Sequence, residues 1–193
     1  HYLNDSANDP VMNRIRAQKL RNSEEDKVKI FFVPSYLNGD DGVFNMPYYD
    51  LLVGMDLTAF PSYYEPWGYT PLESLAFKVP TITTTLAGFG LWVKEHYNMN
   101  HPGIEVIHRE DGDASNVATA IAEWVKNYTQ VGETEMQKDR DNAKDVSRIA
   151  LWDNLINYYK QAYTIALNQV SERLKDLPAN MNESVSYIEK QLT

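Results

Sequence analysis

The feature that most constrains the fold of this chain is a predicted strand, loop, helix and strand within residues 57–84. Residues 57–60 are apolar and prone to β-structure, and residues 79–84 have the same character. The stretch 71–77 between them has the composition of a short helix. Two strands joined by a helix over so few residues must run parallel, through a right-handed crossover. The sequence therefore predicts an α/β domain built on a parallel sheet.

The rest of the chain continues this alternation. We expect further strands over residues 28–33 and 104–108. The order of elements predicts a doubly wound, Rossmann-like sheet in one domain over residues 1–175, with helices at its carboxyl end. Residues 176–193 are expected to form a linker and a short terminal helix. The other helices are expected at 45–55, 91–97, 113–128, 134–149 and 151–170.

The amino-acid composition and net charge of the chain argue against several classes of function. The chain has no cysteine and a net charge of −9. It therefore has no disulfide framework and no cysteine-bound zinc, and it fits a reducing cytoplasm. The negative charge argues against a general nucleic-acid-binding or anionic-membrane surface. No apolar run reaches the roughly 18 residues of a membrane span. The chain opens on His1 instead of methionine, so we expect a piece of a longer protein.

The loop between the first strand and the helix of this unit is the candidate site. Residues 60–71 are rich in aromatic side chains, and they also contain the carboxylate of Glu65 and a glycine, Gly68. A loop that leaves the carboxyl end of a strand and enters a helix is where open α/β sheets bind ligands. The start of the helix adds free N–H groups and the positive end of a dipole, which suit a phosphate.

Local patterns leave two interpretations open for several residues here. Thr70 and Glu73 have the spacing of a capping box, and capping alone would explain Glu73. Glu65 is either a binding residue or an ordinary carboxylate of an exposed loop. Gly88 and Gly90 serve either a tight turn, which we favour, or an anion-binding nest.

A longer pattern around these acids resembles a known family. Seven residues separate Glu65 from Glu73, the E-x7-E spacing of retaining glycosyltransferases with two Rossmann-like domains, the GT-B architecture. Residues 60–71 read FPSYYEPWGYTP and resemble the glycogen synthases of animals and fungi. So do the PTITT and GFG segments within residues 80–90. The resemblance extends over roughly residues 1–170.

The resemblance implies that this domain is the carboxyl-terminal, nucleotide-sugar-binding half of such an enzyme. The implied reaction transfers glucose from a nucleoside diphosphate glucose to the non-reducing end of an α-1,4-glucan, with retention. Glu65 would be the catalytic carboxylate beside the sugar, as a nucleophile or a stabiliser of positive charge, and Glu73 would accept hydrogen bonds from the ribose. Tyr48 either stacks on the base or is a core tyrosine. The residues implied along the glucose and the phosphates are Trp67, Gly68, Tyr69 and Thr70.

The resemblance also sets expectations for partners. The expected donor is UDP-glucose in preference to ADP-glucose, the acceptor is an α-glucan, and no cofactor or metal is expected. The amino-terminal Rossmann-like domain is missing, so this chain alone is expected to be inactive, whereas the full-length protein would be cytoplasmic and able to form homo-oligomers. The family carries an arginine cluster that senses glucose 6-phosphate, but residues 136–145 alternate cations with acids, so we expect no such switch. Two alternatives stay open: another retaining GT-B transferase, and a non-catalytic glucan- or nucleotide-sugar-binding module.

Overall fold

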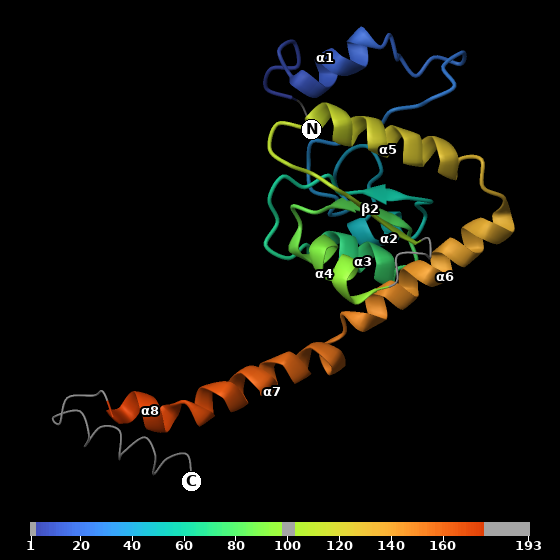
Figure 1. The fold of residues 1–193 in the computed structure, drawn as a ribbon. Coiled ribbons are helices and arrows are strands. Elements are labelled where there is room, and N and C mark those ends of the chain that lie inside the picture. Colours follow the sequence, from blue (N-terminus) through green and yellow to red (C-terminus); the bar gives the residue numbers. More distant parts are fainter. Residues whose placement is uncertain (1–2, 98–102, 176–193) are drawn as a thin grey trace. The chain divides into compact units, whose positions relative to one another are not determined.

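The computed structural model of the chain describes residues 3–97 and 103–175 (Figure 1). It divides into two compact units, with the boundary between Val146 and Ser147. The predicted helices 113–128, 134–149 and 151–170 are confirmed to within two residues at each end, whereas residues 176–193 lie outside the described ranges. In chain order the elements are α1 (Pro10–Ala17), α2 (Tyr48–Leu52), β1 (Thr58–Ala59), α3 (Tyr69–Ala76), β2 (Thr81–Thr84), α4 (Gly88–His96), β3 (Ile104–Ile107), α5 (Ala114–Tyr128), α6 (Glu133–Ile149), α7 (Trp152–Asn168) and α8 (Val170–Lys175).

The centre of the first unit is a three-stranded parallel sheet with the strand order β1-β2-β3. Thr58 of β1 pairs with Thr81 of β2, which in turn pairs with Ile104 of β3. Helix α3 connects β1 to β2, so the parallel strand–helix–strand unit predicted from residues 57–84 is confirmed. The fold is a mixed α/β fold around a small parallel sheet.

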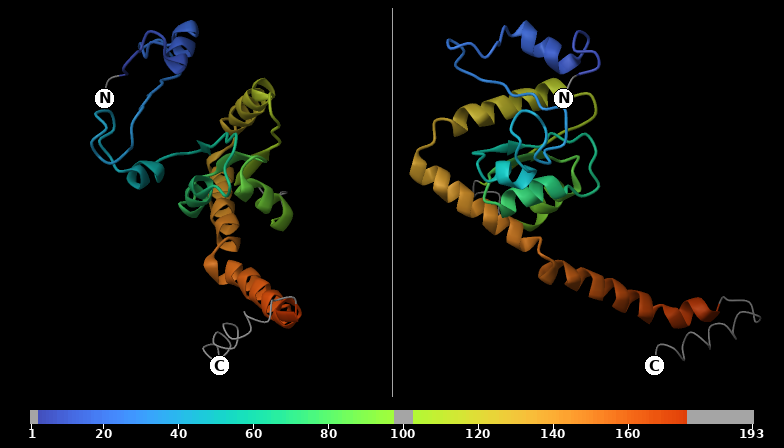
Figure 2. Two further views of the ribbon diagram at one scale, coloured as in Figure 1. Left: turned by 90° about the vertical axis from the view of Figure 1, so that its left-hand side faces the viewer. Right: turned by 180° about the vertical axis from the view of Figure 1, so that it is seen from behind.

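Helices cover both faces of this sheet (Figures 1 and 2). On one face, Ile82 of β2 and Ile107 of β3 form a buried cluster with Val117 of α5. Side chains alternate between the faces of a strand, so Thr83 points to the opposite side. There α4 approaches so closely that a Cβ atom at Gly90 would lie 3.2 Å from Thr83 Cγ2. The core is therefore a sheet with α5 on one side and α3 and α4 on the other.

Hydroxyl groups tie α3 to the sheet. Strand β2 is buried at every position, although three of its four residues are threonines. Thr81 Oγ1 donates to Val79 O at 2.9 Å and lies 3.0 Å from Ser74 Oγ of α3. Ser74 Oγ lies 2.6 Å from Thr58 Oγ1 of β1. A buried hydroxyl costs free energy unless it is hydrogen-bonded, so this row of hydroxyls both satisfies its members and joins three elements.

The predicted strand over residues 28–33 is wrong, because this segment has no helix or strand. Ile30 N donates to Asn22 Oδ1 at 2.9 Å, and Asn22 Nδ2 donates to Ile30 O at 2.8 Å. The asparagine side chain thus occupies the backbone groups that a neighbouring strand would need. Ile30 and Phe32 instead line a cavity of about 450 Å³ together with Met12 of α1. β-propensity reports a preference for a half-buried surface, which this packing also satisfies.

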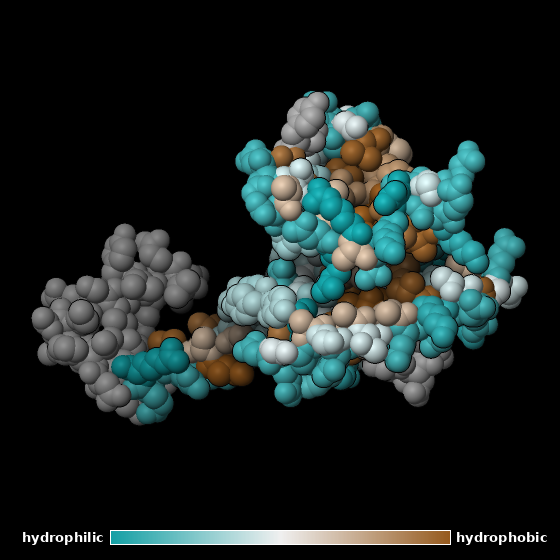
Figure 3. Space-filling model, turned by 90° about the horizontal axis from the view of Figure 1, so that it is seen from above, coloured by the Kyte–Doolittle hydropathy of each residue, from teal (hydrophilic) through white to brown (hydrophobic). Residues whose placement is uncertain are grey.

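The second unit contains α7 and α8. No residue of α7 is buried, although the helix carries many apolar and aromatic side chains. The ring centroids of Trp152 and Tyr159 are 5.1 Å apart, and those of Tyr159 and Tyr163 are 6.5 Å apart. Figure 3 shows hydrophobic residues of the second unit on the surface. Within residues 3–97 and 103–175, no helix combines the length and the apolar character needed to cross a lipid bilayer.

Candidate functional site

The loop that carries Glu65 begins at the carboxyl end of β1, and its backbone is fastened to the start of α4. Glu65 N donates to Leu86 O at 3.1 Å, and Gly88 N donates to Glu65 O at 3.0 Å. Two residues later, Phe89 N donates to Trp67 O at 2.6 Å. The loop is therefore held by its own peptide groups, and its backbone position depends on α4.

Gly88 and Gly90 allow this close approach. A Cβ atom at Gly88 would lie 2.2 Å from Pro66 O, and one at Gly90 would lie 2.4 Å from Thr84 O. Both distances are too short for any side chain, so the two glycines are needed for close packing more than for the tight turn that we favoured. The alternative of an anion nest loses support as well, because the N–H groups of Gly88 and Phe89 already donate to loop carbonyls.

Helix α3 begins earlier than the capping-box prediction requires. Its N-cap is Gly68, with φ at +110°, and no side chain caps the helix. Thr70 is thus the second helical residue, so the predicted capping box with Glu73 is wrong. The physical reason is that glycine adopts a positive φ at little cost, so the chain can turn into the helix at residue 68. Glu73 is not needed for capping and is available for another role.

The amino terminus of α3 presents donors to the site. The first N–H groups of a helix have no partner within the helix. In the part of the chain that the structure describes, the N–H groups of Tyr69 and Thr70 find no acceptor. The Glu65 side chain lies over this helix start, because a Cβ atom at Gly68 would be 3.4 Å from Glu65 Cγ. The helix dipole stabilises negative charge at this place.

Glu73 lies where α2 meets α3. The Tyr49 hydroxyl donates a hydrogen bond to the Glu73 carboxylate, which raises the pKa of Tyr49. The Tyr49 ring also stacks on Phe77 of α3, with 5.3 Å between the ring centroids. Burial, followed by the negative charge of Glu73, raises the pKa of Tyr48. Sequence reasoning missed Tyr49, although its place beside Tyr48 at the start of a short helix could have indicated it.

Tyr48 and Trp67 are both partly buried. The Tyr48 hydroxyl is buried without a hydrogen-bond partner among the described residues, and its ring lines a cavity of about 180 Å³ next to β1. The Trp67 ring packs on α4, 5.6 Å from the Phe89 ring and 5.7 Å from the Trp92 ring. Trp67 therefore anchors the loop, and its contact with a sugar stays a prediction.

The predicted site residues form two groups that α3 connects. Glu65, Gly68, Tyr69 and Thr70 gather at the start of the helix, whereas Tyr48 and Glu73 lie between α2 and α3. Residues three or four positions apart lie on the same face of a helix, one turn or about 5.4 Å apart. Glu73 thus lies one turn below Tyr69 and Thr70. The arrangement offers a carboxylate, free N–H groups, a second carboxylate and a tyrosine along one helix face.

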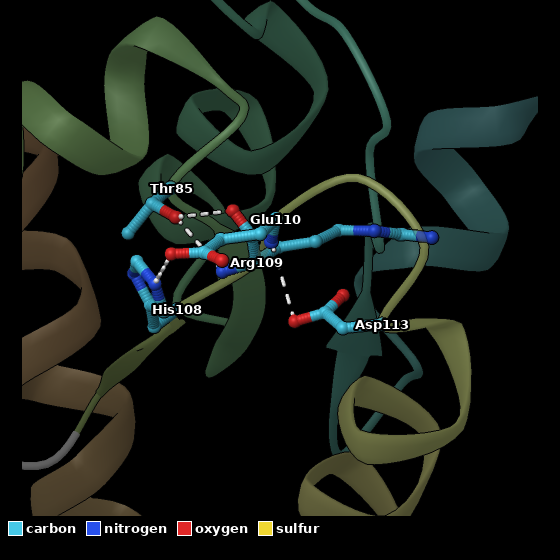
Figure 4. A network of polar contacts seen from close by, with 5 residues as sticks. All are labelled: Thr85, His108, Arg109, Glu110 and Asp113. Carbon is cyan, nitrogen blue, oxygen red and sulfur yellow. Dashed lines mark hydrogen bonds and ion pairs between the residues drawn. The ribbon is translucent and has the colours of Figure 1, made fainter.

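Two further residues, Thr85 and Arg109, lie at the carboxyl edge of the sheet beside the loop of Glu65, and the sequence analysis missed both. Arg109 is only 5% exposed, and its backbone is joined to Thr85 at the ends of β3 and β2 (Figure 4). The signal that could have found Arg109 is its place just after a strand, at the carboxyl edge of the sheet.

Within the described ranges, no three potential metal-ligating side chains lie together.

The chain is similar in sequence to known proteins over most of its length. The family model described as glycogen synthase matches residues 1–191. Glycogen [starch] synthase isoform 1 of Saccharomyces cerevisiae is 31% identical over 192 residues, covering 94% of this chain and 27% of the yeast protein. Glycogen [starch] synthase of Caenorhabditis elegans is 34% identical over 85% of this chain and 25% of its own length. The liver glycogen [starch] synthase of Mus musculus is 30% identical over 88% of this chain and 24% of its own length. The chain spans about a quarter of these relatives, and it belongs to the glycogen synthase family.

Proposed function

We propose that this chain is the donor-binding half of a retaining glycosyltransferase of the glycogen synthase type. The full-length protein would transfer glucose from a nucleoside diphosphate glucose to the non-reducing end of an α-1,4-glucan. In this proposal the small parallel sheet is part of a doubly wound, Rossmann-like domain of a GT-B enzyme. The observation that carries the proposal is the Glu65 side chain, which lies over the uncapped start of α3 at the carboxyl end of β1.

The start of α3 suits the diphosphate of the donor. The leaving nucleoside diphosphate gains negative charge as the glycosidic bond breaks, and preorganised N–H donors stabilise that charge. The free N–H groups of Tyr69 and Thr70 are such donors. The transition state at the sugar resembles an oxocarbenium ion, so the Glu65 carboxylate would stabilise its positive charge or attack it as a nucleophile.

Glu73 and Tyr48 would bind the nucleoside. An ionised carboxylate can accept about four hydrogen bonds, and Tyr49 supplies one of those that Glu73 can accept. The remaining lone pairs can accept from both hydroxyls of a ribose. Tyr48 lies next to Glu73 and would stack on the base, an interaction that discriminates poorly between bases. UDP-glucose is the proposed donor, in preference to ADP-glucose.

The remaining parts of the proposal concern partners and regulation. The acceptor would be an α-glucan, held by an amino-terminal Rossmann-like domain of the same protein in a cytoplasmic enzyme that is able to form homo-oligomers. No sugar-phosphate switch is proposed, because cations of α6 are engaged within the chain. Arg140 Nη2 lies 2.8 Å from Asp56 Oδ1, and Lys138 Nζ lies 3.6 Å from Glu135 Oε1.

The proposal is tested in the full-length protein. Glucose incorporation into glycogen would be measured with UDP-glucose and ADP-glucose for the wild type and for Glu65→Gln, Glu73→Gln and Glu123→Gln. Glu123 is an exposed glutamate of α5 and serves as the control. We expect Glu65→Gln to lower kcat by roughly 10²-fold to 10³-fold, as for the loss of other groups that stabilise transition-state charge. We expect Glu73→Gln to raise the Kd for UDP, measured by calorimetry, with Glu123→Gln unchanged.

The outcomes separate the alternatives. Binding of the donor without transfer by the wild type would indicate a non-catalytic binding module. Transfer to another acceptor, with none to glycogen, would indicate a different retaining transferase. Full activity of Glu65→Gln would contradict the role proposed for this carboxylate.

A further inference from the structure

Arg109 is a buried cation whose backbone is locked to the sheet. It follows β3 by two residues and is 5% exposed. Arg109 N donates to Thr85 Oγ1 at 2.9 Å, and the same hydroxyl donates to Arg109 O at 3.3 Å. Thr85 N donates to Ile107 O at 3.0 Å, which continues the pairing of β2 and β3. The backbone of Arg109 therefore has a fixed position at the carboxyl edge of the sheet.

The side chain of Arg109 reaches the loop that follows β1. Nη1 donates to Pro61 O at 2.5 Å and lies 3.5 Å from Ser62 O. The carbon atom Cζ lies 3.5 Å from the centroid of the Tyr63 ring, an attractive position for a cation. Thr84 Oγ1 donates to the same Ser62 oxygen at 2.8 Å. Three consecutive loop residues, 61–63, are thus held from the ends of β2 and β3.

The contacts of Arg109 with residues 61–63 add to the backbone hydrogen bonds that join the loop to α4. Glu65 and Trp67 are fastened through their backbones to Leu86, Gly88 and Phe89. Arg109 holds the residues just before Glu65. The loop is therefore held on both sides of the carboxylate, and removing either attachment would let Glu65 move.

The charge of Arg109 is costly where it lies. The ion pairs found among the described residues do not include it, and its Nε has no acceptor among them. A guanidinium buried without a carboxylate is expensive to desolvate, whereas an apolar side chain would fill the same space without this cost. The partners of the Arg109 side chain are two carbonyl oxygens and one ring face, all of the loop over residues 61–63. The interaction that offsets the cost of burying the charge is therefore the fixing of this loop.

We propose that Arg109 is a positioning residue that sets the place of the Glu65 carboxylate by holding residues 61–63. The inference rests on the role proposed above for Glu65. Arg109 acts through the loop and not on the donor, because its guanidinium is buried and its Nη1 atom is used by loop carbonyls. It is therefore expected to affect turnover far more than donor binding.

Kinetics of the full-length protein test this, with Arg140→Met as a matched control. Arg140 also donates to a carbonyl next to the sheet, Met55 O at 3.2 Å, but at the amino-terminal end of β1. We expect Arg109→Met to lower kcat by roughly 10²-fold, the effect of a misplaced catalytic group, with the donor KM within about threefold. Arg109→Lys keeps the charge without the planar fork and should recover part of the loss. Arg140→Met should lower the thermal midpoint with kcat within about twofold of the wild type.

A second comparison separates this proposal from the proposed function. In a Glu65→Gln background, Arg109→Met should lower kcat no further, because nothing is left to position. If Glu65→Gln loses activity while Arg109→Met keeps the wild-type kcat, the positioning role is refuted alone. If Glu65→Gln is fully active, the role of Glu65 fails and this inference fails with it. Should Arg109→Met not fold, Tyr63→Leu removes the ring that stacks on the guanidinium, and an unchanged kcat in that variant would overturn the proposal.

Discussion

Replacing Gly88 by alanine tests whether the candidate site is held by the contact between the loop and α4. The added Cβ atom would lie 2.2 Å from Pro66 O and 3.1 Å from Pro66 C. Both neighbours are backbone atoms, so a side-chain rotation cannot relieve the overlap. Either the loop or the helix start must move, and the bonds from Gly88 N to Glu65 O and from Phe89 N to Trp67 O would lengthen or break.

The size of the effect follows from these contacts. Two hydrogen bonds contribute about 1 kcal/mol each, and overpacking in a well-packed region costs about 1–3 kcal/mol. Alanine in place of a helical glycine returns at most about 1 kcal/mol. We therefore expect Gly88→Ala to lower the free energy of unfolding by roughly 2–4 kcal/mol. With a urea m-value of about 2 kcal/mol/M, the midpoint should fall by roughly 1–2 M.

Urea unfolding followed by tryptophan fluorescence measures this, because Trp67 packs on Trp92 across the same contact. Gly54→Ala is the matched control. A Cβ atom at Gly54 would lie 3.4 Å from Leu51 O, an ordinary contact, so that variant should change stability by less than about 1 kcal/mol. A Gly88→Ala variant as stable as the wild type would refute the close approach of loop and helix described above.

Three further predictions concern single groups. Thr85→Val should lower the free energy of unfolding by about 1–3 kcal/mol, because it leaves the buried N–H and C=O of Arg109 unpaired, whereas Thr85→Ser should retain most of the stability in the same urea titration. Burial, with the charge of Glu135 second, raises the pKa of Asp139, so its favourable contribution is full below its unfolded pKa and is lost as the pH rises. Asp139→Asn should therefore raise the urea midpoint near pH 7, and a gain that persists below about pH 4 would contradict this reasoning. The bond to Glu73 raises the pKa of Tyr49, and the charge of Glu73 contributes to the raised pKa of Tyr48, so Glu73→Gln should lower the pKa of both tyrosines in an ultraviolet titration, whereas in a Tyr49→Phe background only the Tyr48 shift should remain.

Much of the fold could be predicted from the sequence because the signals are local. The alternation of apolar and polar residues depends only on neighbours along the chain, so the helices over 113–128, 134–149 and 151–170 were found close to their observed ends. The same holds for the pair of strands within residues 57–84. Family membership was also readable, because the pattern at residues 60–71 is continuous in sequence.

Errors arose where a local pattern competed with a neighbour in space. Residues 28–33 have strand composition, but Asn22 takes the backbone groups of Ile30 that a sheet would use. The capping box at Thr70 matched in spacing, but a positive φ at Gly68 starts the helix earlier. Glycine tolerates many conformations, so its presence does not tell which one the chain adopts.

The sequence by itself determined the parallel strand–helix–strand unit, the long helices over 113–170 and the family, and it indicated the residues of the candidate site. Only the tertiary structure decided how these residues are held. The attachment of the Glu65 loop to α4, the bond from Tyr49 to Glu73 and the brace by Arg109 join positions that are distant along the chain. Such contacts depend on which elements pack against each other in the folded protein. Local patterns of residues along one sequence do not predict that packing.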